Sequence, residues 1–132
     1  MNFFKFFCAL SVAAILATPC QATVRLDIKN DTSEDCSLAV HARIDKTKWL
    51  TIGWYVFASG EEAPIILDKV SDVQSVYIYN DCQRSTPKGE TKRVWVRTNL
   101  QFEDEIPKTN EQGYEEVTFV RMASEKYTIQ AI

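Results

Sequence analysis

The sequence predicts an all-β fold, either an antiparallel β-sandwich or a small barrel, with about eight short strands. Apolar and polar residues alternate in short runs, which is typical of strands with one buried face. Turn-forming residues separate these runs at intervals of about eight to twelve residues. No window shows a convincing helical period over more than about two turns, so we expect no long helix.

The strand signals are clearest in the first half of the chain. In residues 24–29 and 38–44, apolar residues alternate with others, which predicts two strands with one face in the core. Residues 49–57 are aromatic and β-branched and predict a third strand, interrupted by Gly53. The short apolar run 64–67 predicts a fourth strand.

The second half gives shorter signals. Residues 76–79 and 94–96 are β-branched and aromatic, and a polar loop containing Pro87 and Gly89 lies between them. The last predicted strands cover residues 116–122 and 127–132.

The N-terminal residues 1–22 have the layout of a secretory signal peptide. Lys5 supplies a positive charge, an apolar run follows, and small residues lead to a cleavage site after Ala22. The run has about twelve residues, whereas a membrane span needs about twenty. Alternatives are a retained anchor, or lipidation at Cys20, which the preceding Pro19 disfavours. We therefore expect a single β-rich domain, 23–132, in the periplasm or outside the cell, with no transmembrane anchor after cleavage.

The charge balance excludes some partners. The chain has 15 Lys and Arg against 18 Asp and Glu residues, a net charge of −3, and no long block of one sign. A basic stripe for nucleic acid is absent, and so is a polybasic patch for membranes. We expect no nucleic-acid partner, whereas a protein or an envelope component remains open.

Two cysteines remain after cleavage of the signal peptide. In an oxidising compartment Cys36 and Cys82 predict a disulfide bond. The bond would close a loop of about 47 residues and stabilise the fold by about 4 kcal/mol in the chain-entropy model. The alternatives are free structural thiols and a reactive thiol. A reactive thiol needs a nearby base.

Candidate catalytic groups are few. His41 is the single histidine and shares a strand face with Ala39 and Arg43, opposite the apolar set, so we predict a solvated side chain. A three-histidine zinc site is excluded, and the sequence contains no Gly-x-Ser-x-Gly elbow or Asp-x-Asp-x-Asp-Gly calcium frame. We expect no metal and no cofactor.

Carboxylates cluster in predicted loops, where we interpret them as solvated charges. The clusters are Asp31, Glu34 and Asp35; Glu61 and Glu62; and Glu103, Asp104 and Glu105.

Asn30-Asp31-Thr32 fits an N-glycosylation acceptor but is also a good turn. We favour the turn.

Aromatic residues give the best functional lead. Trp49, Trp54, Tyr55 and Phe57 lie within one predicted strand and form the candidate binding set. Side chains alternate along a strand, so Trp54 and Tyr55 cannot both be buried by one face unless Gly53 marks a bulge. Exposed Trp and Tyr favour binding surfaces, and packing between two sheets is the alternative.

Several short motifs follow one another along the chain: Asn30-x-Thr32, Ala39-Val40, Trp49, Gly53-Trp54-Tyr55-Val56, Ser59-Gly60, Tyr77-Ile78-Tyr79, residues 113–119 and Tyr127-Thr128-Ile129. Their order resembles that in a family of small exported bacterial proteins, the domain of unknown function 1036 family. The family often has cysteines where this chain has Lys29 and Glu61 or Glu62, so Cys36 and Cys82 need not repeat a family bridge. The resemblance implies an exported β-rich domain and brings no activity.

These observations favour an exported, non-enzymatic binding domain, for which an inhibitor or immunity-type role is one form. A small secreted hydrolase using carboxylates or His41 is the second hypothesis, and a structural envelope component is the third.

Overall fold

The computed structural model describes residues 23–84 and 87–130, and the predicted signal peptide lies outside them. The predicted all-β fold is confirmed: the described residues form strands and one short 3-10 turn, η2 (Val73–Ser75), between β4 and β5. The strands are β1 (Val24–Asn30), β2 (Cys36–Arg43), β3 (Trp49–Phe57), β4 (Glu62–Leu67), β5 (Val76–Asn80), β6 (Thr91–Arg97), β7 (Phe102–Asp104), β8 (Tyr114–Arg121) and β9 (Lys126–Ile129).

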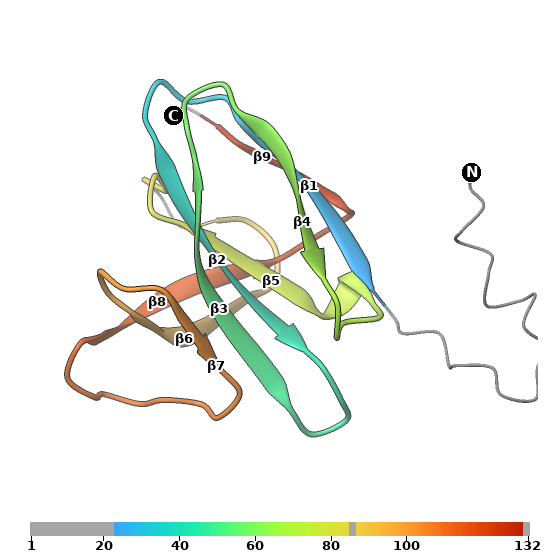
Figure 1. The fold of residues 1–132 in the computed structure, drawn as a ribbon, viewed down its shortest axis with the longest axis vertical. Coiled ribbons are helices and arrows are strands. Elements are labelled where there is room, and N and C mark those ends of the chain that lie inside the picture. Colours follow the sequence, from blue (N-terminus) through green and yellow to red (C-terminus); the bar gives the residue numbers. More distant parts are fainter. Residues whose placement is uncertain (1–22, 85–86, 131–132) are drawn as a thin grey trace, which may run out of the picture.

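The strands form two sheets (Figure 1). A small sheet has the order β4-β1-β9, and a large curled sheet has the order β6-β8-β5-β2-β3-β7. One face of the large sheet packs on the small sheet and forms the main core, with fully buried side chains such as Leu26, Ile28, Leu38 and Ile78. Pro64 lies in β4, at the edge of the small sheet, where its missing N–H disturbs no inner ladder.

The large sheet also buries its second face. Along β2, Leu38 and Val40 point into the main core, whereas Ala39 and His41 point to the opposite side. There a second apolar cluster fills the concave side of the sheet; its buried members are Ala39, Tyr77, Val96, Phe102, Val117 and Phe119. The prediction of a solvated His41 is therefore wrong, because the curl of the sheet leaves this residue only 7% exposed.

A β-bulge interrupts β3 at the predicted glycine. Leu38 pairs with Tyr55 and Ala39 pairs with Gly53, so Trp54 is the extra residue. A Cβ atom at Gly53 would collide with the ring of Phe102 on β7. Glycine thus lets the Phe102 ring pack directly on the β3 backbone.

Two features of the sheets differ from the sequence expectation. β7 was not predicted, because its three residues include two acids and its pairing with β3 is a long-range contact. β9 runs parallel to β1, although all other strand pairs are antiparallel. The chain crosses from β8 in the large sheet to β9 in the small sheet before this pair forms.

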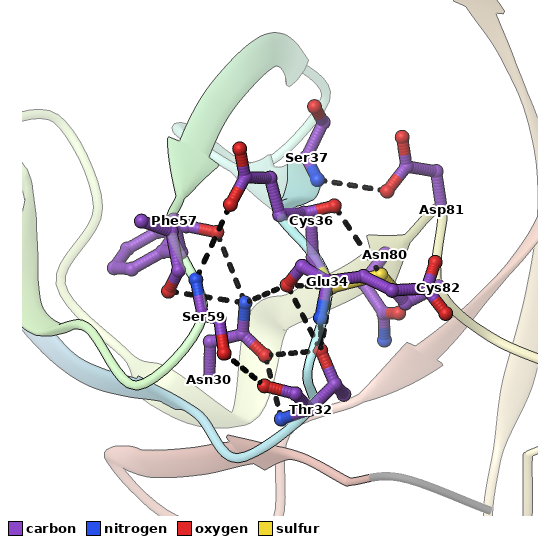
Figure 2. Close-up of a disulfide and its surroundings, with 12 residues drawn as sticks. Asn30, Thr32, Glu34, Cys36, Ser37, Phe57, Ser59, Asn80, Asp81 and Cys82 are labelled. Carbon is purple, nitrogen blue, oxygen red and sulfur yellow. Dashed lines mark hydrogen bonds between the residues drawn. A yellow bond between two sulfur atoms is a disulfide. The ribbon is translucent and has the colours of Figure 1, made fainter.

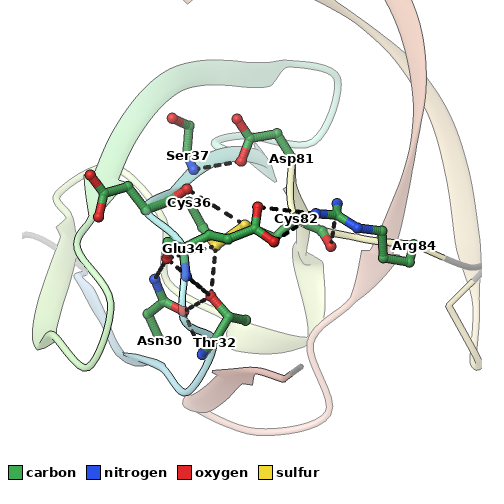
Figure 3. A network of polar contacts seen from close by, with 9 residues as sticks. Asn30, Thr32, Glu34, Cys36, Ser37, Asp81, Cys82 and Arg84 are labelled. Carbon is green, nitrogen blue, oxygen red and sulfur yellow. Dashed lines mark hydrogen bonds and ion pairs between the residues drawn. A yellow bond between two sulfur atoms is a disulfide. The ribbon is translucent and has the colours of Figure 1, made fainter. Parts of the chain in front are cut away.

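The predicted disulfide bond between Cys36 and Cys82 is confirmed (Figure 2). It joins the beginning of β2 to the turn after β5, its neighbour in the large sheet. Beside it, Asp81 accepts a hydrogen bond from the Ser37 backbone, and Arg84 forms an ion pair with Glu34 at 2.9 Å (Figure 3).

Asn30 organises the same end of the molecule. Its fully buried amide nitrogen donates to the carbonyl groups of Glu34, Phe57 and Ala58, and its amide oxygen accepts from the backbone and hydroxyl groups of Thr32 (Figure 2). These bonds tie the end of β1 to the beginning of β2 and the end of β3. Since Asn30 Nδ2 is buried and engaged, the structure favours the turn over a glycosylation acceptor.

Candidate functional site

A cavity of about 320 Å³ opens on the concave side of the large sheet. We call it the His41 cavity. Both edge strands of the sheet, β6 and β7, contribute to its wall, so it lies where the two edges of the curled sheet face each other. Its lining residues are His41, Trp49, Thr51, Lys92, Arg93, Val94, Trp95, Asp104, Pro107, Lys108, Thr109 and Glu116.

The His41 ring lies flat against Trp49, with ring centroids 4.7 Å apart and an interplanar angle of 9°. The pairing follows from the register, because His41 on β2 faces Thr51 on β3 and Trp49 is two residues away on the same side. His41 Nδ1 lies 2.8 Å from the Thr51 hydroxyl, while His41 Nε2 is buried and has no hydrogen-bond partner among residues 23–84 and 87–130.

Lys92 contacts the same indole. Its ammonium lies 3.5 Å from the Trp49 ring centroid and 5.6 Å from that of Tyr77. Such cation–π contacts contribute about 0.5–2 kcal/mol, depending on exposure. Within the described part of the chain, Lys92 forms no ion pair. The neighbouring Glu90 is engaged by the Tyr77 hydroxyl and by Arg121.

Burial shifts the proton affinity of both basic groups. Burial, followed by the positive charge of Lys92, lowers the pKa of His41 from its ordinary value of 6.5 to about 3. Burial also lowers the pKa of Lys92, and the negative charge of Glu90 opposes that shift. At neutral pH His41 is therefore an uncharged ring beside a cation.

The carboxylates of the cavity already have partners. Asp104 accepts a hydrogen bond from the Tyr114 hydroxyl at 3.1 Å, and Glu116 pairs with Arg93 at 3.3 Å. Of the predicted acidic clusters, only Asp104 lines this cavity. No carboxylate among the described residues is hydrogen-bonded to His41, which makes His41 unlike the oriented histidine of a catalytic triad.

The four predicted binding aromatics do not form one surface. Trp49 lines the His41 cavity, whereas Trp54 lines a separate hollow of about 440 Å³ with Tyr79 on the same side of the sheet. Tyr55 is half-buried against the main core, and Phe57 is a buried member of it at 4% exposure. Only the two tryptophans thus line hollows of the concave side.

Trp54 has a structural role that the sequence did not reveal. Its backbone N–H and C=O bond to the Gln101 side chain, and its indole N–H donates to the Arg97 carbonyl of β6 at 2.9 Å. Trp54 therefore links β3 to the opposite edge of the curled sheet. All polar atoms of Trp54 take part in these hydrogen bonds and are not available for a ligand.

Sequence reasoning missed Lys92 and Trp95 as members of the site. Lys92 was assigned to a polar loop, although β6 begins at Thr91 and directs Lys92 to the concave side. Its alternation with Val94 and Val96 was the available signal.

One trio of metal-ligating residue types lies together in the described region, at Cys36, Asp81 and Cys82. Both sulfur atoms belong to the disulfide bond and cannot act as thiolate ligands while it is intact. None of the described helical segments is long and apolar enough to cross a membrane.

Comparison with known proteins identifies no relative: no family model, no curated protein and no solved structure matches this chain.

The lowered pKa of His41 predicts a pH dependence of stability. Between about pH 6.5 and 3 the unfolded chain takes up a proton at His41 and the folded chain does not, so acid destabilises the fold. The stabilisation is complete above pH 6.5 and is lost as the pH falls, at up to about 1.4 kcal/mol per unit. Urea unfolding at several pH values should show that His41→Gln reduces this slope. Thr51→Val keeps the imidazole and should retain the slope of the unfolding free energy against pH. Identical slopes for wild type and His41→Gln would show that His41 does not cause the pH dependence.

Proposed function

We propose that this protein is an exported, non-enzymatic binding domain and that its ligand occupies the His41 cavity. The observation that supports the proposal most is the combination, in one cavity, of a half-buried indole, Trp49, with the Lys92 ammonium, which forms no ion pair within the described residues. A charged group without a counter-charge at an apolar cavity is well placed to be paired by a ligand.

The same geometry argues against the hydrolase hypothesis. A general base works best when its pKa lies near the working pH, and a pKa of about 3 makes His41 a weak base at neutral pH. Its ring is hydrogen-bonded to Thr51 rather than to a carboxylate. The carboxylates Asp104 and Glu116 are engaged by Tyr114 and Arg93.

An inhibitor or immunity-type role fits a small domain with a binding cavity and, among the residues that the structure describes, no assembled catalytic set. The partner would then insert one of its groups into the cavity. The family resemblance supports the same compartment but names no activity, so the proposal rests on the cavity.

We further propose that residues 1–22 are removed during export. The support is the disulfide between Cys36 and Cys82, because such bonds persist in oxidising compartments.

Protein purified from the periplasm or medium should begin at Thr23, and its two remaining cysteines should be oxidised. Intact mass spectrometry would then find a mass two hydrogens below that of the reduced chain, with no thiol available for alkylation before reduction. Retention of the N-terminal segment, or free thiols in the exported protein, would contradict this part of the proposal.

Replacement of Trp49 should abolish ligand retention. The wild-type protein is immobilised and incubated with peptide, glycan and lipid fractions of the cell envelope, and retained compounds are identified by mass spectrometry. A compound retained by wild type and by Tyr55→Phe, a control outside the cavity, should be lost with Trp49→Ala.

Equal retention by Trp49→Ala would exclude the His41 cavity as the site. Turnover of a glycan or ester substrate that His41→Ala abolishes would favour the hydrolase instead. A protein that retains nothing from any fraction would favour the structural envelope hypothesis.

A further inference from the structure

The charges around the His41 cavity do not cancel. Three cations, Lys92, Arg93 and Lys108, line it together with the two carboxylates of Asp104 and Glu116. Arg93 is paired with Glu116, and Asp104 is bonded to a neutral tyrosine, whereas neither Lys92 nor Lys108 has an ion-pair partner in the described residues. The chain as a whole has a net charge of −3, so a cavity with excess positive charge is a local departure from the overall balance.

From this arrangement we propose that the cavity recognises an anionic group of its ligand, a carboxylate or a phosphate, through the Lys92 ammonium. The inference rests on the proposed function and defines the ligand class of the same site.

The ammonium of Lys92 is the main attraction for an anion. It is half-buried against the faces of Trp49 and Tyr77, which replace only part of the hydration that it loses. An anion in the cavity would form a charge-assisted hydrogen bond with it, which is roughly twice as strong as a neutral one.

His41 lines the same cavity, and its ring is stacked on Trp49, the indole that Lys92 contacts. With its lowered pKa the imidazole is uncharged at neutral pH, so the attraction for an anion comes from the ammonium. His41 therefore reports on what enters the cavity.

The apolar part of the cavity wall indicates the chemistry of the rest of the ligand. Trp49, Val94, Trp95 and Pro107 present apolar surface in the same cavity. A ligand that carries an anionic group on an aromatic or aliphatic body would fit this division, whereas a neutral sugar would leave the ammonium without its counter-charge.

The single histidine of the chain allows a direct test. The imidazole C–H resonances of His41 are followed by proton NMR while benzoate, phenyl phosphate or benzyl alcohol is added. The three probes share a ring and differ in the charged group. Benzoate or phenyl phosphate should shift the resonances in a saturable manner and bind at least about tenfold more tightly than benzyl alcohol, as expected for a hydrogen bond to a charged group. Preference between the two anions identifies the carboxylate or the phosphate.

A matched pair of lysine variants tests whether Lys92 causes the preference for anionic probes. Lys92→Met removes the charge and keeps an apolar stem, and it should weaken binding of the anionic probe about tenfold or more without changing that of benzyl alcohol. Lys126→Met removes an exposed charge from the small sheet and should change neither.

Two results would overturn the inference. Equal binding of benzyl alcohol and the anions would show an apolar cavity that does not select charge, and the proposed binding function would stand. Absence of any response of His41 to benzoate and phenyl phosphate would also reject anion recognition, whereas the retention experiment with Trp49→Ala judges the binding function separately. The comparison of probes on the wild-type protein needs no variant, so it decides the matter even if Lys92→Met fails to fold.

Discussion

The close approach of the Phe102 ring to Gly53 is the constraint on which the concave side of the large sheet depends. No side chain larger than hydrogen fits between the β3 backbone and this ring. The contact lets β7 pair with β3 and places Phe102 in the second apolar cluster, between the ring of Trp54 and that of Tyr114. Without the contact between Gly53 and Phe102, the concave face of the large sheet would be exposed to water. The core between the large and the small sheet would then be the only one.

The same region shapes the contacts between the two edges of the large sheet. The bulge places Trp54 where its indole reaches the Arg97 carbonyl, which holds β3 against the opposite edge strand β6. Further along these strands, the Lys92 ammonium lies over the Trp49 ring. The contact between β3 and β6 is made there by side chains and not by backbone hydrogen bonds. The two edges are therefore joined by a hydrogen bond at Trp54, whereas at Trp49 they line the His41 cavity.

Local patterns predicted most of the fold but only part of the site. Alternation located most of the strands, and the cysteine count with the predicted compartment predicted the disulfide. The bulge at Gly53 was one of two alternatives, because glycine inside a strand often marks a bulge. The burial of His41 was predicted wrongly, since it shares its strand face with the charged Arg43 and the small Ala39, and only the long-range curl covers it. Lys92 was missed for a related reason: a lysine becomes a cavity residue only when Trp49, distant in sequence, lies beside it.

A double-mutant cycle between Gly53 and Phe102 tests the central claim most directly. Gly53→Ala should lower the free energy of unfolding by about 1–3 kcal/mol, because the added methyl group displaces the ring. In a Phe102→Leu background the smaller side chain leaves room, so the cost of Gly53→Ala should fall by at least about 1 kcal/mol. A Phe119→Leu background, which alters the same cluster away from Gly53, should leave the cost unchanged. Additive effects of Gly53→Ala and Phe102→Leu would contradict the account, because they would mean that the two residues do not constrain each other.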